Sequence, residues 1–163
     1  MRAAPSRPLA SPHRGATNGG VSTGKRVQLG LRIALVDADA LQRACTANSL
    51  TALGADVVPF VHLADLVGAF DARQKFDGVV VGLHADARRT LSRVPDLEAA
   101  AGRALPLVYV THRSELQAVD AVPTALRAGR SFQLLCSPVE DAQLLAWLET
   151  LAAWGRGTLR ARA

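Results

Sequence analysis

From residue 31 onward, short apolar runs alternate with amphipathic stretches. The apolar runs predict strands at residues 31–36, 55–61, 77–83, 107–111 and 131–136. The run at 77–83 has valine at three successive central positions, which predicts a strand buried on both faces. The amphipathic stretches predict helices at 39–53, 62–73, 86–103, 114–128 and 139–154. This alternation is typical of a parallel sheet covered by helices on both faces.

Local signals refine the predicted helices. Asp39 fits an N-cap of the first helix and Gly54 fits its C-terminal stop. Pro95 predicts a break or restart in the third helix, and Pro123 predicts a kink or shortening in the fourth.

Spacing also predicts which side chains are buried. The first helix is expected to bury a stripe that includes Leu41, Ala44, Cys45, Asn48 and Leu53. The last helix is expected to bury Leu144, Leu145, Leu148, Leu151 and Ala152.

Five strand–helix units of this length predict an α/β fold. The expected architecture is a flavodoxin-like (CheY-like) three-layer sandwich, with a five-stranded parallel sheet of order 2-1-3-4-5. Right-handed crossovers should place helices on both faces of the sheet. A chain of 163 residues fits one such domain with tails.

Composition separates the tails from the domain. Residues 1–29 are rich in Pro, Ser, Gly, Thr and Arg, which predicts a disordered basic tail or linker before a domain at 30–155. Residues 156–163 form a second basic tail. The net charge of +5 is misleading, because the first 29 residues carry five basic residues without an acid and the last eight carry three more. The domain is therefore slightly acidic, which argues against a nucleic-acid partner.

The sequence also bears on location. No apolar run approaches the roughly 20 residues that span a bilayer, and the N-terminus lacks the apolar region of a secretory signal, so we expect no membrane association. Cys45 and Cys136 are far apart and match neither a disulfide framework nor a metal site. We interpret both as reduced, buried residues of a cytoplasmic protein.

In sheets of the predicted order, a site lies beyond the carboxyl ends of the strands. The residues at or near those ends are Asp37, Gly82, Thr111 and Ser137. The sequence supports neither a zinc site nor a hydrolase or nucleotide-binding motif. His62 and His112 have no partner at zinc-ligand spacing, and there is no nucleophile elbow or glycine-rich nucleotide loop.

Several segments resemble the receiver domains of two-component systems. The run FDGVVVGLH (76–84) resembles their third strand, which commonly ends D-L-x-M-P, and Gly82 stands where the Asp accepts a phosphoryl group. The run VDAD (36–39) resembles their acidic V-D-D-x signature, with Asp37 on the first acid and Ala38 on the second. Thr111 matches the switch Ser/Thr. The run LLCSPV (134–139) resembles x-L-x-K-P-V, with Ser137 in place of lysine.

The resemblance implies a degenerate receiver, or pseudo-receiver, whose local sequence is most similar to receivers of hybrid histidine kinases. It would be no enzyme and would need no metal or cofactor, because two carboxylates and the lysine of the pocket are absent. Asp37 and Thr111 would remain as a vestigial pocket. A lone Asp37 reached by water would need no cationic partner.

Such a domain would act by protein–protein contact in phosphorelay signalling. Its partner would be a histidine kinase, a phosphotransfer protein or an effector domain, or a second copy of the chain. The resemblance places the contact on the fourth helix, fifth strand and fifth helix, here residues 113–130 and 139–154.

Two alternatives stay open. One is a phosphorylatable receiver that uses Asp37, Asp39 or Asp86 as acceptor and still binds Mg²⁺. The other is a small-molecule or nucleotide binder on the same flavodoxin-like fold. His84, in the loop after the third strand, is interpreted as an ordinary loop histidine.

Overall fold

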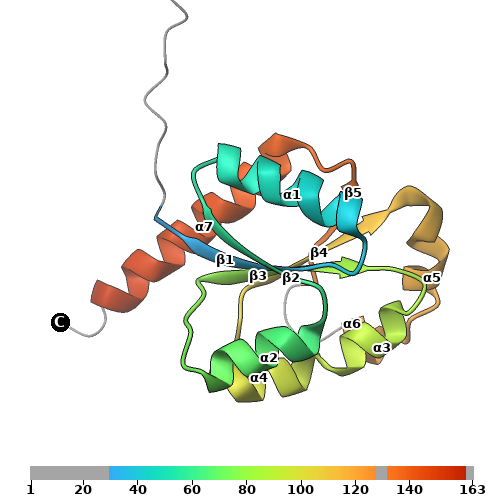
Figure 1. Cartoon of the computed structure of the whole chain (residues 1–163), viewed down its shortest axis with the longest axis horizontal. Helices are drawn as coiled ribbons and strands as arrows, with labels where there is room; N and C mark the ends of the chain where they lie inside the picture. Colours follow the sequence, from blue (N-terminus) through green and yellow to red (C-terminus); the bar gives the residue numbers. More distant parts are fainter. Residues whose placement is uncertain (1–29, 128–131, 161–163) are drawn as a thin grey trace, which may run out of the picture.

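Five parallel strands form one sheet at the centre of the molecule (Figure 1). The computed structural model describes residues 30–127 and 132–160, the last six by their backbone alone. The strand order is β2-β1-β3-β4-β5, which confirms the predicted topology. The strands are β1 (Arg32–Val36), β2 (Asp56–Phe60), β3 (Gly78–Leu83), β4 (Leu107–His112) and β5 (Leu134–Ser137).

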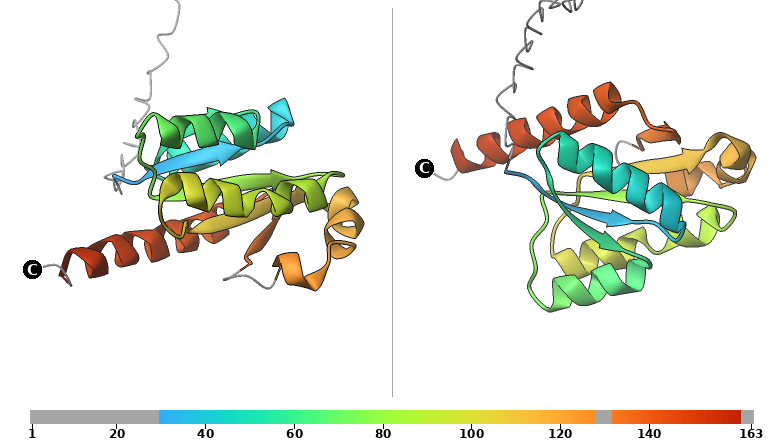
Figure 2. Two further views of the ribbon diagram at one scale, coloured as in Figure 1. Left: turned by 90° about the horizontal axis from the view of Figure 1, so that it is seen from below. Right: turned by 45° about the horizontal axis from the view of Figure 1, so that its top comes forward.

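Helices cover both faces of the sheet and complete the predicted three layers (Figure 1, Figure 2). One face carries α1 (Ala40–Ala52) and α7 (Asp141–Arg160). The other face carries α2 (Leu63–Asp71), α3 (Ala87–Ser92), α4 (Val94–Ala101), α5 (Leu116–Asp120) and α6 (Thr124–Arg127). A short 3₁₀ helix, η1 (Arg113–Glu115), follows β4 directly.

The central strand β3 joins the two halves of the core. Val79 and Val81 pack with the helices around α2, whereas Val80 packs with α1 and α7. Every residue of β3 is buried, as its continuous apolar sequence predicts. Gly78 lies where α7 crosses the strand, and a Cβ built there would lie 2.6 Å from Leu151 Cδ1. Glycine at this position lets α7 approach the sheet closely.

Both proline predictions are confirmed. Helix α3 ends at Ser92 and α4 begins at Val94, with Pro95 in its first turn. The predicted fourth helix is divided into η1, α5 and α6, and Pro123 comes directly before α6. The predicted start of the fifth strand, Ser131, and the predicted tail at residues 1–29 lie outside the described residues.

The buried side of α1 differs from the prediction. The side chain of Asp39 caps the helix by accepting a hydrogen bond from Gln42 N, as expected. The buried residues, however, are Gln42, Thr46 and Leu50, whereas Leu41 is 75% exposed. The predicted stripe is therefore wrong by one residue, because two of the three core-facing positions are polar and carry no hydrophobic signal.

The expectation that both cysteines are buried is wrong. Cys45 is exposed and Cys136 is half-buried, and both are free thiols.

Helix α7 confirms most of its predicted inner face. Leu144, Leu148 and Leu151 are buried, but Leu145 is 37% exposed, so its predicted burial is wrong. Leu145 follows Leu144 by one position, about 100° around the helix, and therefore turns away from the sheet. Among the described helices, none is long and apolar enough to cross a membrane.

Candidate functional site

The carboxyl ends of β1, β3, β4 and β5 meet at one edge of the sheet. Register pairs Leu83 of β3 with Thr111 of β4, and His112 of β4 with Ser137 of β5. A Cβ built on Gly82 would overlap the carboxylate of Asp37. The predicted strand-end residues therefore lie together, as expected for parallel strands.

Asp37 is buried and held by hydrogen-bond donors on both carboxylate oxygens. Its Oδ1 accepts from the backbone N–H of Asp39 at 2.8 Å and contacts His84 Nε2 at 2.7 Å. Its Oδ2 accepts from Gln42 Nε2 at 2.9 Å. The side chain of Arg43 donates to the Asp37 backbone carbonyl. Asp37 is only 2% exposed, so the condition that water reaches it, under which it would need no cationic partner, is not met.

His84 bridges two carboxylates at this edge. Its Nε2 contacts Asp37 Oδ1 at 2.7 Å, and its Nδ1 contacts Glu115 Oε2 at 3.0 Å. An imidazole donates to both carboxylates only when both ring nitrogens are protonated. Burial alone lowers the pKa of His84, but the hydrogen bonds and charges of Asp37 and Glu115 outweigh it and raise that pKa above its ordinary value. We therefore treat His84 as a cation between them.

Sequence reasoning missed this role of His84 and the contributions of Gln42 and Glu115. One signal was present, since His84 follows Gly82 by two positions and residues two apart in an extended chain share a face. The partners Asp37 and Glu115 are 47 and 31 positions away, so no local pattern connects them to His84.

Thr111 is fully buried, and its hydroxyl is already used within the protein. Its Oγ1 donates to the Leu83 backbone carbonyl at 2.8 Å. It thus ties β4 to the end of β3. Of the predicted vestigial pair, Asp37 and Thr111 both lie at this edge of the sheet, and the side chain of each is engaged by protein groups.

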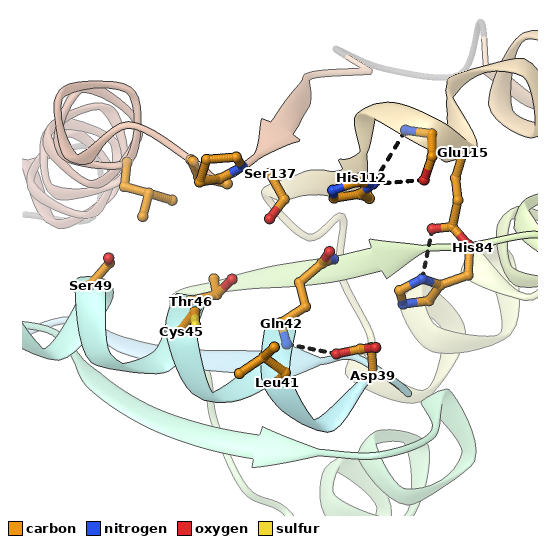
Figure 3. A pocket seen from close by; sticks show the side chains of 14 residues that line it. Asp39, Leu41, Gln42, Cys45, Thr46, Ser49, His84, His112, Glu115 and Ser137 are labelled. Carbon is orange, nitrogen blue, oxygen red and sulfur yellow. Dashed lines mark hydrogen bonds and ion pairs between the residues drawn. The ribbon is translucent and has the colours of Figure 1, made fainter.

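Two clefts, each of about 440 Å³, open at this edge. The first lies between α1 and the segment from β5 to α7, and Ser137 belongs to it (Figure 3). The second lies over Asp37, Ala38 and Gly82, and its walls include Asp86, Arg89 and Arg93. His84 lines both clefts.

The residues of the second cleft do not fit a magnesium ion. Mg²⁺ requires near-octahedral oxygen ligation with carboxylate help. Both oxygens of Asp37 are engaged by protein donors, and Ala38 and Gly82 have no side-chain oxygen to offer. Within the described ranges, no group of three or more His, Cys, Asp or Glu residues could hold a metal ion.

No protein-family model matches the chain, and no curated protein is similar to it in sequence. Solved structures do share its fold. A putative pilus assembly-related protein from Burkholderia pseudomallei is 24% identical, with a TM-score of 0.61 over 77% of this chain and 92% of that chain. The signal receiver domain of a modulated diguanylate cyclase from Desulfovibrio desulfuricans is 22% identical, with a TM-score of 0.58 over 78% of this chain and 97% of that chain.

A third similar structure is the receiver domain of a sensor histidine kinase from Pseudomonas aeruginosa. It is 22% identical, with a TM-score of 0.57 over 76% of this chain and 98% of that chain, and has a magnesium ion in its active-site cleft. At these identities the likeness shows the fold. The chain therefore has the fold of response-regulator receiver domains.

Proposed function

We propose that this chain is an atypical receiver domain of two-component signalling that lacks the phosphoacceptor and acts through protein–protein contact. The observation that carries the proposal is the environment of Gly82. Glycine has no side chain that attacks a phosphoryl group, and the space where a side chain would begin is occupied by the Asp37 carboxylate.

The charges around Asp37 support the same proposal. In an intact receiver pocket, crowded carboxylates need a magnesium ion and a lysine to offset their repulsion. Here His84 supplies a positive charge directly to Asp37 and Glu115. The His84 side chain thereby neutralises much of the negative charge of these two carboxylates. A phosphoryl group would find no lysine to pair with, since Ser137 stands at the position of the family lysine.

The alternative is phosphorylation on a substitute aspartate. Asp37 is poorly placed because it is buried and fully hydrogen-bonded. Asp39 caps α1 and lines the first cleft. Asp86 is exposed and lines the second cleft beside Arg89 and Arg93, so it is the strongest of the three candidates.

The proposed partner is a histidine kinase, a phosphotransfer protein, an effector domain or a second copy of the chain. The proposed contact face comprises α5, α6, β5 and α7. Among the described residues, these elements carry three of the five large apolar side chains that are exposed, namely Leu126, Leu145 and Trp154. We place the contact on these elements because they carry most of the large apolar side chains that are exposed among the described residues.

Intact mass spectrometry after incubation with acetyl phosphate and MgCl₂ tests the missing acceptor. The native chain should gain no phosphoryl group, while the Pseudomonas aeruginosa receiver domain treated in parallel shows that the reagent is competent. A single phosphoryl adduct on the native chain that disappears in Asp86→Asn or Asp39→Asn would overturn the proposal and identify the acceptor.

A further inference from the structure

The first cleft is a mixed apolar and polar cavity separate from the Gly82 environment. It is about 440 Å³ in volume, within the range of small-molecule sites. Leu41 of α1, Pro138, Val139 and Leu144 of α7 supply its apolar lining. Figure 3 shows α1 on one side of the cleft and the segment from β5 to α7 on the other.

Three hydroxyl groups line this cleft without a hydrogen-bond partner among the described residues. They belong to Thr46 and Ser49 on α1 and to Ser137 at the end of β5 (Figure 3). Thr46 is only 6% exposed as a residue, yet its Oγ1 remains open to solvent through the cleft. Ser49 and Ser137 are half-buried, so all three hydroxyls are open to hydrogen-bonding groups that enter the cleft.

The charge of the lining is negative at one end. Asp39 and Glu115 contribute carboxylates, and none of the lining residues is Lys or Arg. The hydrogen bond from Gln42 N lowers the pKa of Asp39 below its ordinary value, so this carboxylate is ionised at neutral pH. The positive charge of His84 is already shared between Asp37 and Glu115. Such a lining disfavours phosphate and carboxylate ligands.

We propose that the cleft binds a small organic cation, a protonated amine carried on an apolar body. The ammonium group lies at the Asp39 and Glu115 end, where it is attracted electrostatically. The apolar body packs against Leu41, Val139 and Leu144. The hydroxyls of Thr46, Ser49 and Ser137 form hydrogen bonds with polar groups of the bound ligand. This site does not depend on whether any aspartate of the chain accepts a phosphoryl group.

Cys45 lines the cleft and makes binding measurable in the native chain. The test compares tryptamine, an aromatic amine, with indole-3-propionic acid, which has the same ring and the opposite charge. At ten times its dissociation constant, tryptamine should slow alkylation of Cys45 by iodoacetamide about tenfold by mass action. The acid should leave the rate unchanged. Cys136, which does not line the cleft, is the internal control for both compounds.

Isothermal titration calorimetry with tryptamine then identifies the groups responsible. Asp39→Asn keeps a good N-cap residue but removes the charge, and should weaken binding about threefold to fivefold. Thr46→Val keeps the side-chain shape but removes a hydroxyl that has no partner among the described residues, and should weaken binding about twofold to tenfold. Asp71→Asn, at the end of α2 on the opposite face, makes the same charge change and should leave binding unaffected.

Three results would overturn the proposal. The first is equal protection of Cys45 by the amine and the acid. The second is the absence of protection by tryptamine at millimolar concentration, including the case in which tryptamine binds elsewhere and leaves Cys45 reactive. The third is native affinity for tryptamine in both Asp39→Asn and Thr46→Val.

Discussion

At the scale of single residues, a histidine and a glycine define the carboxyl edge of this sheet. His84 satisfies the buried carboxylate of Asp37 and ties it to Glu115 in the segment after β4. Gly82 leaves room for that carboxylate, because any side chain there would begin against it. Both residues therefore set the environment of the Asp37 carboxylate, and a substitution of either should change that environment.

Replacing His84 should destabilise the fold. In His84→Ala, Asp37 keeps its other hydrogen bonds but loses its cation, and we expect a loss of about 1.5–3 kcal/mol in the free energy of unfolding, typical of hydrogen bonds to charged groups. Urea denaturation measures it. The matched control is His62→Asn, which removes an exposed histidine but keeps a good N-cap residue for α2, and should not lower stability by more than about 0.5 kcal/mol. Equal effects of the two substitutions would contradict the bridging role of His84.

The pH dependence of stability should carry the signature of His84. Its folded pKa is raised, so its stabilising contribution is complete below the unfolded pKa of about 6.5 and is lost as pH rises through the folded pKa. Urea midpoints should therefore fall as the solution is taken from mildly acidic to alkaline. His84→Gln should flatten this slope. A native slope retained in His84→Gln would show that another group is responsible.

Restoring receiver chemistry requires more than one change. Gly82→Asp alone should lose about 1–3 kcal/mol of stability, because its Cβ meets the Asp37 carboxylate and a second negative charge enters a buried site. The triple variant Gly82→Asp, Ala38→Asp, Ser137→Lys should regain Mg²⁺ binding, measured by calorimetry with MgCl₂. The gain should be larger when His84→Ala is added, because His84 competes for Asp37.

Two outcomes bear on this restoration. Mg²⁺ binding by the triple variant, absent from the native chain, supports a receiver pocket stripped of its charges. If the triple variant folds normally yet shows no gain in Mg²⁺ affinity with or without His84, these strand ends do not form a receiver pocket.

At the scale of elements, contact between α7 and β3 depends on the absence of a side chain at Gly78. A Cβ there would lie 2.6 Å from Leu151 Cδ1 and 3.0 Å from Trp147 Cζ2. On the other face, the predicted third and fourth helices are each divided into shorter ones near Pro95 and Pro123. The arrangement of helices therefore depends on a close helix–sheet contact on one face and on breaks between short helices on the other.

Gly78→Ala should destabilise the protein by about 1–3 kcal/mol through overpacking against α7. Gly68→Ala provides a matched control, because Gly68 lies within α2 and a Cβ there has nothing within 4 Å. Alanine is the better helix former, so this control should gain about 0.5–1 kcal/mol. Thermal unfolding of the two variants should therefore shift in opposite directions, and a shift in the same direction would contradict the close approach of α7.

At the scale of the whole molecule, a sheet with two buried faces concentrates polar groups at one edge. The two clefts open there and share His84. The second cleft lies over the glycine that replaces the acceptor, whereas the first presents hydroxyls and carboxylates beside α1. A ligand in the first cleft would therefore lie next to the Asp37–His84–Glu115 bridge.

The sequence alone determined the layers, the strand order, the breaks at Pro95 and Pro123, and the meeting of strand ends at one edge. These features follow from local periodicity and from the rule that parallel strands share their carboxyl ends. The tertiary structure decided which side of α1 is buried, because Gln42 and Thr46 are polar residues at core-facing positions. Only the tertiary structure brings His84 to Asp37 and Glu115. These partners lie 47 and 31 positions away in the sequence, so no local spacing predicts the contacts, and the burial of this part of the fold decides them.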